Sequence, residues 1–238
     1  MRKEDPLLPQ LTILMNTAQP IKLFNTYRGM PISYDARITA IDQGCVILNV
    51  HKYQAVCMFL DSRTSLISPN LPDIYDAQVI SLDVTKRQAV LAVFKKLFKS
   101  LERRGEVRVQ PENPIPVELW VGAVRSAGKL ADISISGLGV VSFGTFVYTN
   151  QAIEKNATIQ LEFSLPGIVE PLRVKGKAVH AALGDDPRWH RLGMEISLED
   201  DTRTLLQNYV DQREVELLRE VSFIYDSMLL MRQRAGAR

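Results

Sequence analysis

Short strand-like runs separated by turn residues recur along most of the 238-residue chain, and they constrain its fold more than any other feature. The runs are rich in β-branched and aromatic residues, and Gly, Pro, Asn, Asp or Ser stand at their ends, which is the pattern of antiparallel strands. The clearest hairpin joins residues 77–84 to 88–94 across Thr85-Lys86-Arg87. The first part of the chain therefore predicts a small antiparallel barrel or sandwich, with strands at 32–41, 46–50, 55–60, 77–82 and 89–94.

A second set of strand-like runs follows after a proline cluster at positions 111, 114 and 116. Their spacing and turn residues again favour a closed antiparallel barrel. The expected strands are 117–121, 130–141, 157–165, 172–181 and 188–196. The chain is thus predicted to be mainly β, with two small antiparallel barrels.

The C-terminal segment predicts one long helix. Asp200 or Asp201 is a suitable cap, and neither Pro nor Gly interrupts the chain before Gly236. Apolar residues recur there at spacings of 4, 3, 4 and 3, which is typical of a coiled-coil seam: Leu217, Val221, Ile224, Met228 and Met231. A homo-oligomer formed through this helix and a helix packed on its own barrel both remain open.

Positive charge is concentrated in one short segment. The whole chain carries a net charge of +2, whereas residues 95–110 contain six basic and two acidic side chains, a local excess of +4. The segment lies between the two sets of strands, so we expect a connector there. The predicted organisation is a first barrel at 1–94, a basic connector at 95–110, a second barrel at 111–198 and a helix at 199–235.

Composition excludes several classes of protein. With 46% hydrophobic and 24% charged residues, the chain matches an ordinary globular protein. The two cysteines, Cys45 and Cys57, stand in apolar sequence, which favours buried thiols in a reducing compartment. The N-terminus lacks the pattern of a signal peptide, and the uncharged stretch 133–153 is too polar for a membrane span. We therefore expect a cytoplasmic protein without membrane insertion.

No residue pattern supports catalysis or metal binding. His180 and His190 flank a turn, but two imidazoles without further ligands more often form a surface pair. Gly137-Leu-Gly139 fails the dinucleotide-binding fingerprint at its third glycine, and no phosphate-binding loop is present. The sequence predicts a protein that is not an enzyme.

Two short motifs stand in a fixed order across the connector and the second barrel. Arg104-Gly-Glu-Val-Arg108 is an R-x-x-x-R element preceded by Arg103, and Asp132-Ile-Ser134-Ile-Ser-Gly137 is a D-x-S-x-x-G element. Together they resemble the PilZ domain, the bacterial receptor module for cyclic di-GMP. Arg191-Leu-Gly193-Met-Glu-Ile196 and the following helix are also similar to the end of that domain, so the resemblance covers about residues 101–210. The two-part layout is similar to that of flagellar-brake-type PilZ proteins, which implies a split-barrel-like first domain.

The resemblance implies a ligand and its contacts. Arg103, Arg104 and Arg108 would stand before the barrel, whereas Asp132, Ser134 and Gly137 would lie on its surface. An arginine fork can hold phosphate oxygens or the guanine O6 and N7 atoms. A carboxylate can accept from guanine N1–H and the exocyclic amine, and glycines let the backbone approach a ligand. The predicted cyclic di-GMP site is Arg103, Arg104, Arg108, Asp132, Ser134, Gly137, Gly139 and Gly193.

This site suggests a conformational output. Cyclic di-GMP bridging the connector and the barrel would neutralise the self-repelling connector, fix the geometry between the domains and signal to a protein partner in motility, biofilm formation or polysaccharide output. The alternative is a cyclic di-GMP-gated, DNA-binding transcriptional regulator that uses Lys95, Lys96 and Lys99, although no helix-turn-helix pattern is visible. A third reading is a structural module in which the motifs are silent.

Overall fold

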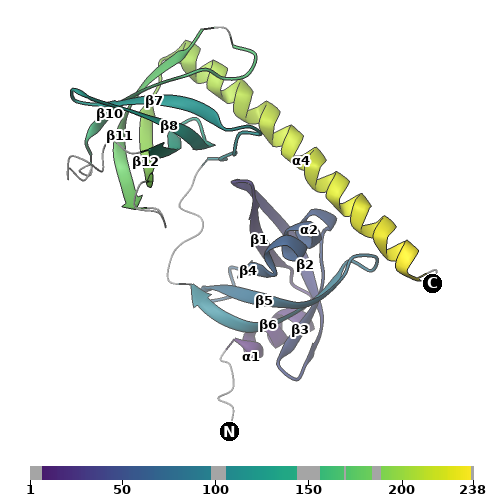
Figure 1. Cartoon of the computed structure of the whole chain (residues 1–238). Helices are drawn as coiled ribbons and strands as arrows, with labels where there is room; N and C mark the ends of the chain where they lie inside the picture. The colour runs from purple at the N-terminus through teal and green to yellow at the C-terminus, as the bar shows by residue number, and fades with distance from the viewer. Residues whose placement is uncertain (1–6, 98–105, 144–155, 169, 184–188, 237–238) are drawn as a thin grey trace. The chain divides into compact units, whose positions relative to one another are not determined.

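The chain forms two compact units, each built around a closed six-stranded antiparallel barrel (Figure 1). The computed structural model describes residues 7–97, 106–143, 156–168, 170–183 and 189–236. The first unit comprises Met1–Tyr27, Pro31–Arg104 and Glu216–Arg238, and the second comprises Arg28–Met30 and Gly105–Val215. The mainly β, two-barrel fold predicted from the sequence is confirmed.

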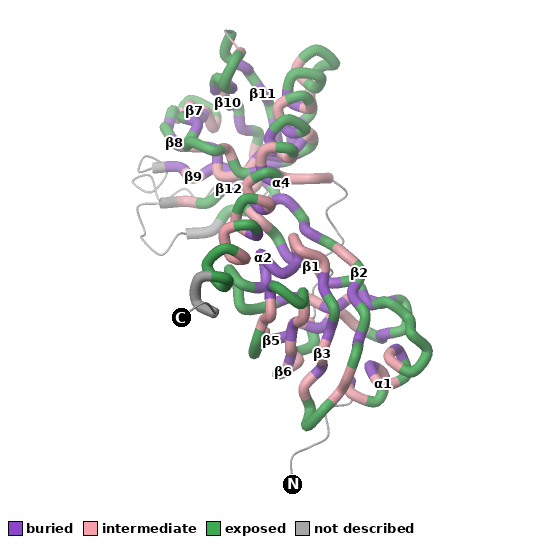
Figure 2. The backbone as a smooth tube through the Cα atoms, turned by 90° about the vertical axis from the view of Figure 1, so that its right-hand side faces the viewer, coloured by how far each residue is buried: buried purple, intermediate pink, exposed green. Residues whose placement is uncertain are grey.

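The first barrel closes in the order β1-β2-β3-β6-β5-β4, with β1 paired to β4. Buried and exposed residues alternate along its strands, so every second side chain enters the core (Figure 2). The predicted hairpin is β5 and β6, joined antiparallel. The strands are β1 (Ile21–Tyr27), β2 (Met30–Asp42), β3 (Cys45–Asn49), β4 (Arg63–Ile67), β5 (Ile74–Asp83) and β6 (Gln88–Leu97).

Two helices belong to this barrel, and one of them corrects the sequence prediction. The run 55–60 is not a strand but part of helix α2 (Lys52–Asp61). The side chain of His51 caps the helix by accepting from the N–H of Tyr53, and Ser62 ends it with φ of 55°. Four consecutive residues from Ala55 are buried, and such an apolar run looks the same in a buried helix and a buried strand. Helix α1 (Leu8–Asn16) adds Leu11 and Leu14 to the core.

The second barrel closes in the order β10-β11-β12-β9-β8-β7, with β10 paired to β7. The single strand expected at 130–141 is wrong, because the chain turns between Ile133 and Gly137 and runs back as the next strand. The other expected runs all contain strands. The strands are β7 (Ile115–Val121), β8 (Val124–Ile133), β9 (Gly137–Phe143), β10 (Thr158–Phe163), β11 (Leu172–Leu183) and β12 (Trp189–Ser197).

Helix α4 (Asp200–Gly236) is the long helix that the sequence predicts, and it begins with Asp200 and Asp201 in its first turn. From Glu216 onward it belongs to the first unit, where Val221 packs with Val56 and Val84 of the first barrel. Ile224, Met228 and Leu229 pack against the same cluster, and the hydroxyl of Tyr225 donates to the carbonyl oxygen of Val84 at 3.3 Å. Most of the predicted coiled-coil seam is therefore buried within the chain, against the first barrel rather than the barrel that precedes the helix, whereas its last residue, Met231, is 71% exposed.

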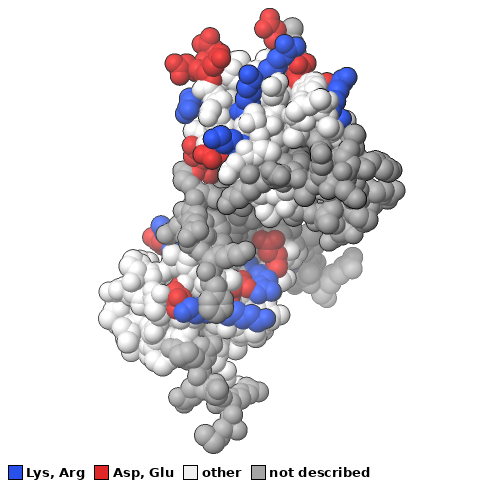
Figure 3. All heavy atoms as spheres, turned by 90° about the vertical axis from the view of Figure 1, so that its left-hand side faces the viewer, with Lys and Arg blue, Asp and Glu red and all other residues white. Residues whose placement is uncertain are grey.

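The basic segment begins inside the first barrel. Strand β6 runs to Leu97, so Lys95 and Lys96 are strand residues rather than part of a connector, and Lys96 pairs with Asp73 at 2.6 Å. Residues 98–105 of the expected connector, including Lys99, lie outside the described residues. On the face shown in Figure 3, basic and acidic side chains are interspersed over the described parts of both units. No helix within the described ranges is long and apolar enough to cross a membrane.

Candidate functional site

Six of the eight predicted ligand residues are described, and all six belong to the second unit. Arg108 precedes the barrel, Asp132 lies near the end of β8, Gly137 and Gly139 lie on β9, and Gly193 lies on β12. The sixth, Ser134, stands in the turn between β8 and β9. Arg103 and Arg104 lie outside the described residues.

A backbone bridge places Arg108 beside the D-x-S-x-x-G motif. The N–H of Val109 donates to the carbonyl oxygen of Ile133 at 2.9 Å, and the N–H of Ile133 donates back to Val109 at 2.9 Å. Val109 is fully buried, so the bridge is also held by packing. Arg213 of α4 donates from Nε to the carbonyl oxygen of Gln110 at 3.1 Å. The second half of the R-x-x-x-R motif is thereby fixed against the end of β8.

Strand register lines up three predicted residues on the outer face of the barrel. Asp132 pairs with Gly139 across β8 and β9, and Gly139 pairs with Gly193 across β9 and β12. The adjacent residues Leu138 and Leu192 are fully buried in the barrel. Because successive side chains on a strand point to opposite faces, the row from Asp132 to Gly193 points outward.

The Asp132 carboxylate lies between two guanidinium groups. Its Oδ1 atom accepts from Nη1 of Arg108 at 3.0 Å, and its Oδ2 atom is 3.5 Å from Nη2 of Arg191. The Asp132 side chain is only 14% exposed, whereas that of Arg191 is 63% exposed. The site therefore joins one shielded carboxylate to two planar cations, one of them largely open to solvent.

Two glycines on β9 make room for this ion pair. A Cβ atom at Gly139 would lie 2.7 Å from Cγ and 2.9 Å from Oδ1 of Asp132. A Cβ atom at Gly137 would lie 3.0 Å from Nη2 of Arg108 and 2.9 Å from the carbonyl oxygen of Met194. All four distances are shorter than ordinary contacts. The Arg108 and Asp132 side chains therefore lie directly on backbone that has no side chain of its own.

Gly193 is in a different environment. The nearest atom to a Cβ added there is Cβ of His180 at 3.5 Å, which is an ordinary van der Waals distance. An alanine at this position would therefore fit the barrel as it stands. Gly193 is next in the row after Gly139, on the outer face of β12.

The hydroxyl of Ser134 is hydrogen-bonded within the turn. Its hydroxyl donates to the carbonyl oxygen of Gly137 at 3.0 Å, and its backbone N–H donates to the same oxygen at 2.9 Å. The residue is only 1% exposed. Here Ser134 closes the β8–β9 turn that carries the motif, and its hydroxyl does not reach the surface.

Arg191 is the residue that the prediction omitted. It stands two positions before Gly193 on β12, so the alternation of a strand places both on the outer face. The sequence contained this signal, because Arg191 opens the stretch through Ile196 that resembles the end of a PilZ domain. Its contact with Asp132 depends on the β9–β12 pairing, which one strand alone does not reveal.

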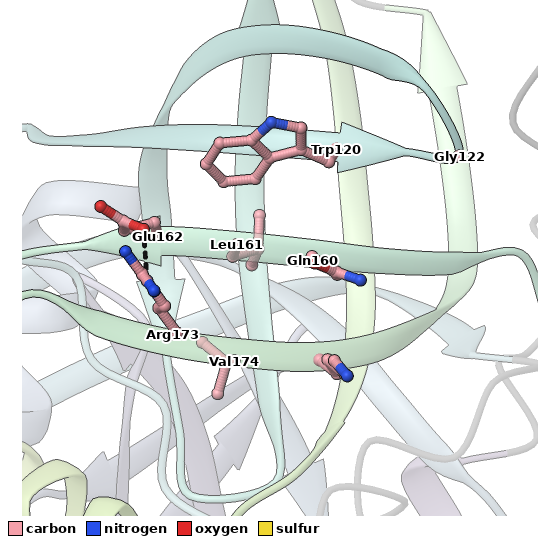
Figure 4. A pocket seen from close by; sticks show the side chains of 8 residues that line it. Trp120, Gly122, Gln160, Leu161, Glu162, Arg173 and Val174 are labelled. Atoms are coloured by element: carbon pink, nitrogen blue, oxygen red, sulfur yellow. Dashed lines mark hydrogen bonds and ion pairs between the residues drawn. The ribbon is translucent and has the colours of Figure 1, made fainter.

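Two shallow hollows lie on the same barrel. One, of about 450 Å³, adjoins the site because its Glu195 pairs with Gly137; its lining is Thr158, Lys175, Gly176, Lys177, Glu195 and Ser197. The other, of about 400 Å³, lies over β7, β10 and β11 beside the Trp120 ring and the Glu162–Arg173 ion pair (Figure 4). None of the six described ligand residues lines this second hollow, so it is not part of the candidate site.

The described part of the chain contains no group of three or more His, Cys, Asp and Glu side chains that could hold a metal ion. The site's chemistry is that of paired arginine and carboxylate groups on a strand surface. Such a set can bind anions through the arginines and hydrogen-bond donors through the carboxylate.

Comparison with known families identifies the second unit. Residues 102–212 match the model of the PilZ domain. The chain carries a PilZ domain. The resemblance drawn from the R-x-x-x-R and D-x-S-x-x-G motifs is confirmed, and the Arg108–Asp132 pair joins the two motifs within the PilZ domain.

Two uncharacterised proteins of Aquifex aeolicus (strain VF5) are similar to this chain. One is 30% identical over 122 residues, which are 51% of this chain and 54% of the relative, so the match spans about half of that protein. The other is 24% identical over 228 residues, which are 90% of this chain and 96% of the relative. The second match extends over both units.

Solved structures are also similar to this chain. The complex of K. pneumonia MrkH with c-di-GMP is 11% identical, with a TM-score of 0.45, and the match covers 90% of this chain and 96% of that one. YcgR from Escherichia coli in complex with c-di-GMP is 14% identical, with a TM-score of 0.43, and the match covers 93% of this chain and 96% of that one.

Proposed function

We propose that this protein is a non-catalytic receptor for cyclic di-GMP, which binds on the outer face of β8, β9 and β12. The observation that carries the proposal is the Asp132 carboxylate held between Arg108 and Arg191 on a glycine-lined surface of the PilZ domain. Cyclic di-GMP presents two phosphodiester anions and two guanines. A site with planar cations beside a carboxylate offers a partner to each of these groups.

Each residue has a chemical role in this proposal. Arg108 and Arg191, with Arg103 and Arg104 supplied by the motif, bind phosphate oxygens or the O6 and N7 edge of guanine. Asp132 accepts from guanine N1–H and the exocyclic amine. Gly193 supports the proposal because it has no side chain of its own on the outer face of β12, where a base or sugar would need to approach.

The output that we propose is conformational and acts on a protein partner in the cytoplasm. Residues 95–110 carry an excess charge of +4, and two phosphodiesters would offset half of it. The weaker self-repulsion favours an ordered arrangement of the segment that leads from β6 to the PilZ domain. Small-angle scattering tests this part: cyclic di-GMP should change the radius of gyration, and an unchanged scattering curve at saturating ligand would remove the conformational output but not the binding.

Isothermal titration calorimetry tests the binding itself. The protein is titrated with cyclic di-GMP, with GTP and cyclic AMP as controls for selectivity. Arg104→Ala and Asp132→Ala should each lose at least tenfold in affinity, because each removes a charged partner of the ligand. Arg125→Ala is the matched control, since it removes one positive charge from β8 where Arg125 pairs with the exposed Glu118. Unchanged affinity in both site variants would overturn the assignment.

The DNA-binding alternative makes a different prediction. Binding to duplex DNA should fall steeply with salt and should depend on Lys95, Lys96 and Lys99. The pairing of Lys96 with Asp73 already offsets one of these charges and argues against it. A mobility shift at low salt, measured with and without cyclic di-GMP, separates the two outputs, and a ligand-dependent shift would favour the transcriptional regulator.

A further inference from the structure

The outward face of α4 carries a stripe of exposed apolar side chains. Val215, Phe223 and Leu230 are 48%, 73% and 58% exposed, respectively. At 3.6 residues per turn, positions 215 to 230 of the stripe fall within about 100° of the helix circumference. The opposite face carries Leu217 and Val221, which are fully buried. The helix therefore has one face used within the chain and a second, partly apolar face directed to solvent.

Two opposite charges interrupt the stripe at symmetrical places. Arg219 and Asp226 are both exposed and stand between the apolar residues. Within the described residues, neither makes an ion pair. A point between Ser222 and Phe223 is equally far along the helix from Arg219 and Asp226, and also from Val215 and Leu230.

We propose that this face is a docking surface for α4 of a second copy of the chain, in an antiparallel pair. About a twofold axis near Phe223, Arg219 lies opposite the partner's Asp226, and Val215 lies opposite the partner's Leu230. Both ion pairs form at once, because an isologous contact repeats each pair. A parallel pair would instead set Arg219 against the partner's Arg219, so charge complementarity selects the antiparallel arrangement.

The composition of the stripe sets the strength of the pair. Each copy contributes three exposed apolar side chains and two charges, far less than an obligate interface, which is large and mainly apolar. The association is therefore reversible and depends on protein concentration and salt, since exposed ion pairs weaken as salt rises. This proposal does not rest on cyclic di-GMP binding, because the stripe lies outside the predicted ligand site.

Sedimentation velocity of the full chain over a range of concentrations tests the proposal. The wild-type protein should shift from monomer to dimer as concentration rises. Arg219→Glu alone and Asp226→Arg alone should each raise the dissociation constant at least tenfold, because each places like charges opposite one another twice. Phe223→Ala should weaken the dimer as well, whereas Ile13→Ala, which removes a 62% exposed side chain from α1, should leave it unchanged.

A mixture of the two charge variants gives the most specific result. In a mixed antiparallel pair, the new glutamate of the Arg219→Glu copy lies opposite the new arginine of the Asp226→Arg copy. The native Asp226 of the first copy lies opposite the native Arg219 of the second, so both pairs attract. The mixture should therefore form dimers although each variant alone remains monomeric, and the double variant Arg219→Glu/Asp226→Arg should regain the wild-type mass. A wild-type protein that is monomeric at all concentrations, or a mixture that stays monomeric, would refute the pairing.

Discussion

Alanine variants of Gly139 and Gly193, the two glycines in register with Asp132, should separate effects on stability from effects on ligand binding. In Gly139→Ala, the new methyl carbon would lie 2.7 Å from Cγ of Asp132, closer than non-bonded carbon atoms approach. The carboxylate must turn away, and it then loses its places beside Arg108 and Arg191. In Gly193→Ala, the methyl group meets its nearest atom at 3.5 Å, so nothing has to move.

The expected magnitudes follow from these contacts. Inserting a methyl group into occupied space costs about 1–3 kcal/mol, and two partly exposed ion pairs add at most about 1 kcal/mol each. Gly139→Ala should therefore lower the melting temperature of the second unit by roughly 5–15 °C. Gly193→Ala should change stability by no more than about 0.5 kcal/mol, because the position is at the surface and sterically open.

Affinity for cyclic di-GMP should fall in both variants for different reasons. Gly139→Ala displaces the carboxylate that is proposed to accept from guanine, whereas Gly193→Ala fills space that the ligand is proposed to occupy. A loss of at least tenfold in Gly193→Ala without a change in melting temperature would locate the ligand over this part of β12. Thermal melting followed by circular dichroism and calorimetric titration of the same preparations measure the two quantities.

A third glycine supplies the control for destabilisation. A Cβ atom at Gly128 on β8 would lie 2.5 Å from the carbonyl oxygen of Val141, so Gly128→Ala should destabilise the same barrel without touching Asp132. It should retain most of its affinity at a temperature where it is folded. A wild-type melting temperature and affinity in Gly139→Ala, or an unchanged affinity in Gly193→Ala, would contradict these expectations.

Three further predictions concern single side chains. Ser134→Ala should destabilise the second unit by about 1 kcal/mol in urea unfolding, because the carbonyl oxygen of Gly137 loses one of its two donors. A free energy of unfolding equal to that of the wild type would show that the backbone hydrogen bond alone holds the turn. Burial lowers the pKa of His51 from 6.5, and the positive charges of Lys52 and Arg87 lower it further. The neutral imidazole therefore stabilises the folded state above pH 6.5, and this contribution is lost as the pH falls. His51→Asn keeps a capping side chain, so its urea midpoint should drop less between about pH 7 and 5 than that of the wild type. Burial raises the pKa of Cys57 to about 12, so Ellman's reagent at pH 8 should modify the half-buried Cys45 first and Cys57 only on unfolding, and equal rates would contradict this.

The strand content of this chain could be predicted because alternation and turn residues are local signals. The hairpin of β5 and β6 and most strands of the second barrel follow directly from them. Helix α2 could not be predicted in this way, since Ala55 to Met58 are all buried and show neither the helical nor the strand period. The division of 130–141 into two strands depends on the turn that Ser134 closes by its hydrogen bond to Gly137.

The candidate site was predicted from two motifs that resemble those of the PilZ domain. Arginine and aspartate motifs indicated a phosphate and guanine site, and the structure brings Arg108 and Asp132 together at 3.0 Å. Arg191 was missed because its approach to Asp132 arises from the pairing of β9 with β12, which are separated by more than forty residues of sequence. The hydrogen bond from Ser134 to the backbone of Gly137 could not be predicted either, because a motif does not show whether a hydroxyl faces a ligand or the protein's own backbone.

Selectivity for guanine, on the proposed function, resides in Asp132 more than in the arginines. Phosphate from any nucleotide can bind Arg108 and Arg191, but doing so draws both guanidinium groups away from a carboxylate that is only 14% exposed. A carboxylate left without donors in such a place is costly, so the incoming ligand must return hydrogen bonds to it. Guanine does so with N1–H and its exocyclic amine, whereas the corresponding edge of adenine presents an unprotonated N1 that repels the carboxylate. The ion pair that organises the site thus also sets the condition that a ligand has to meet.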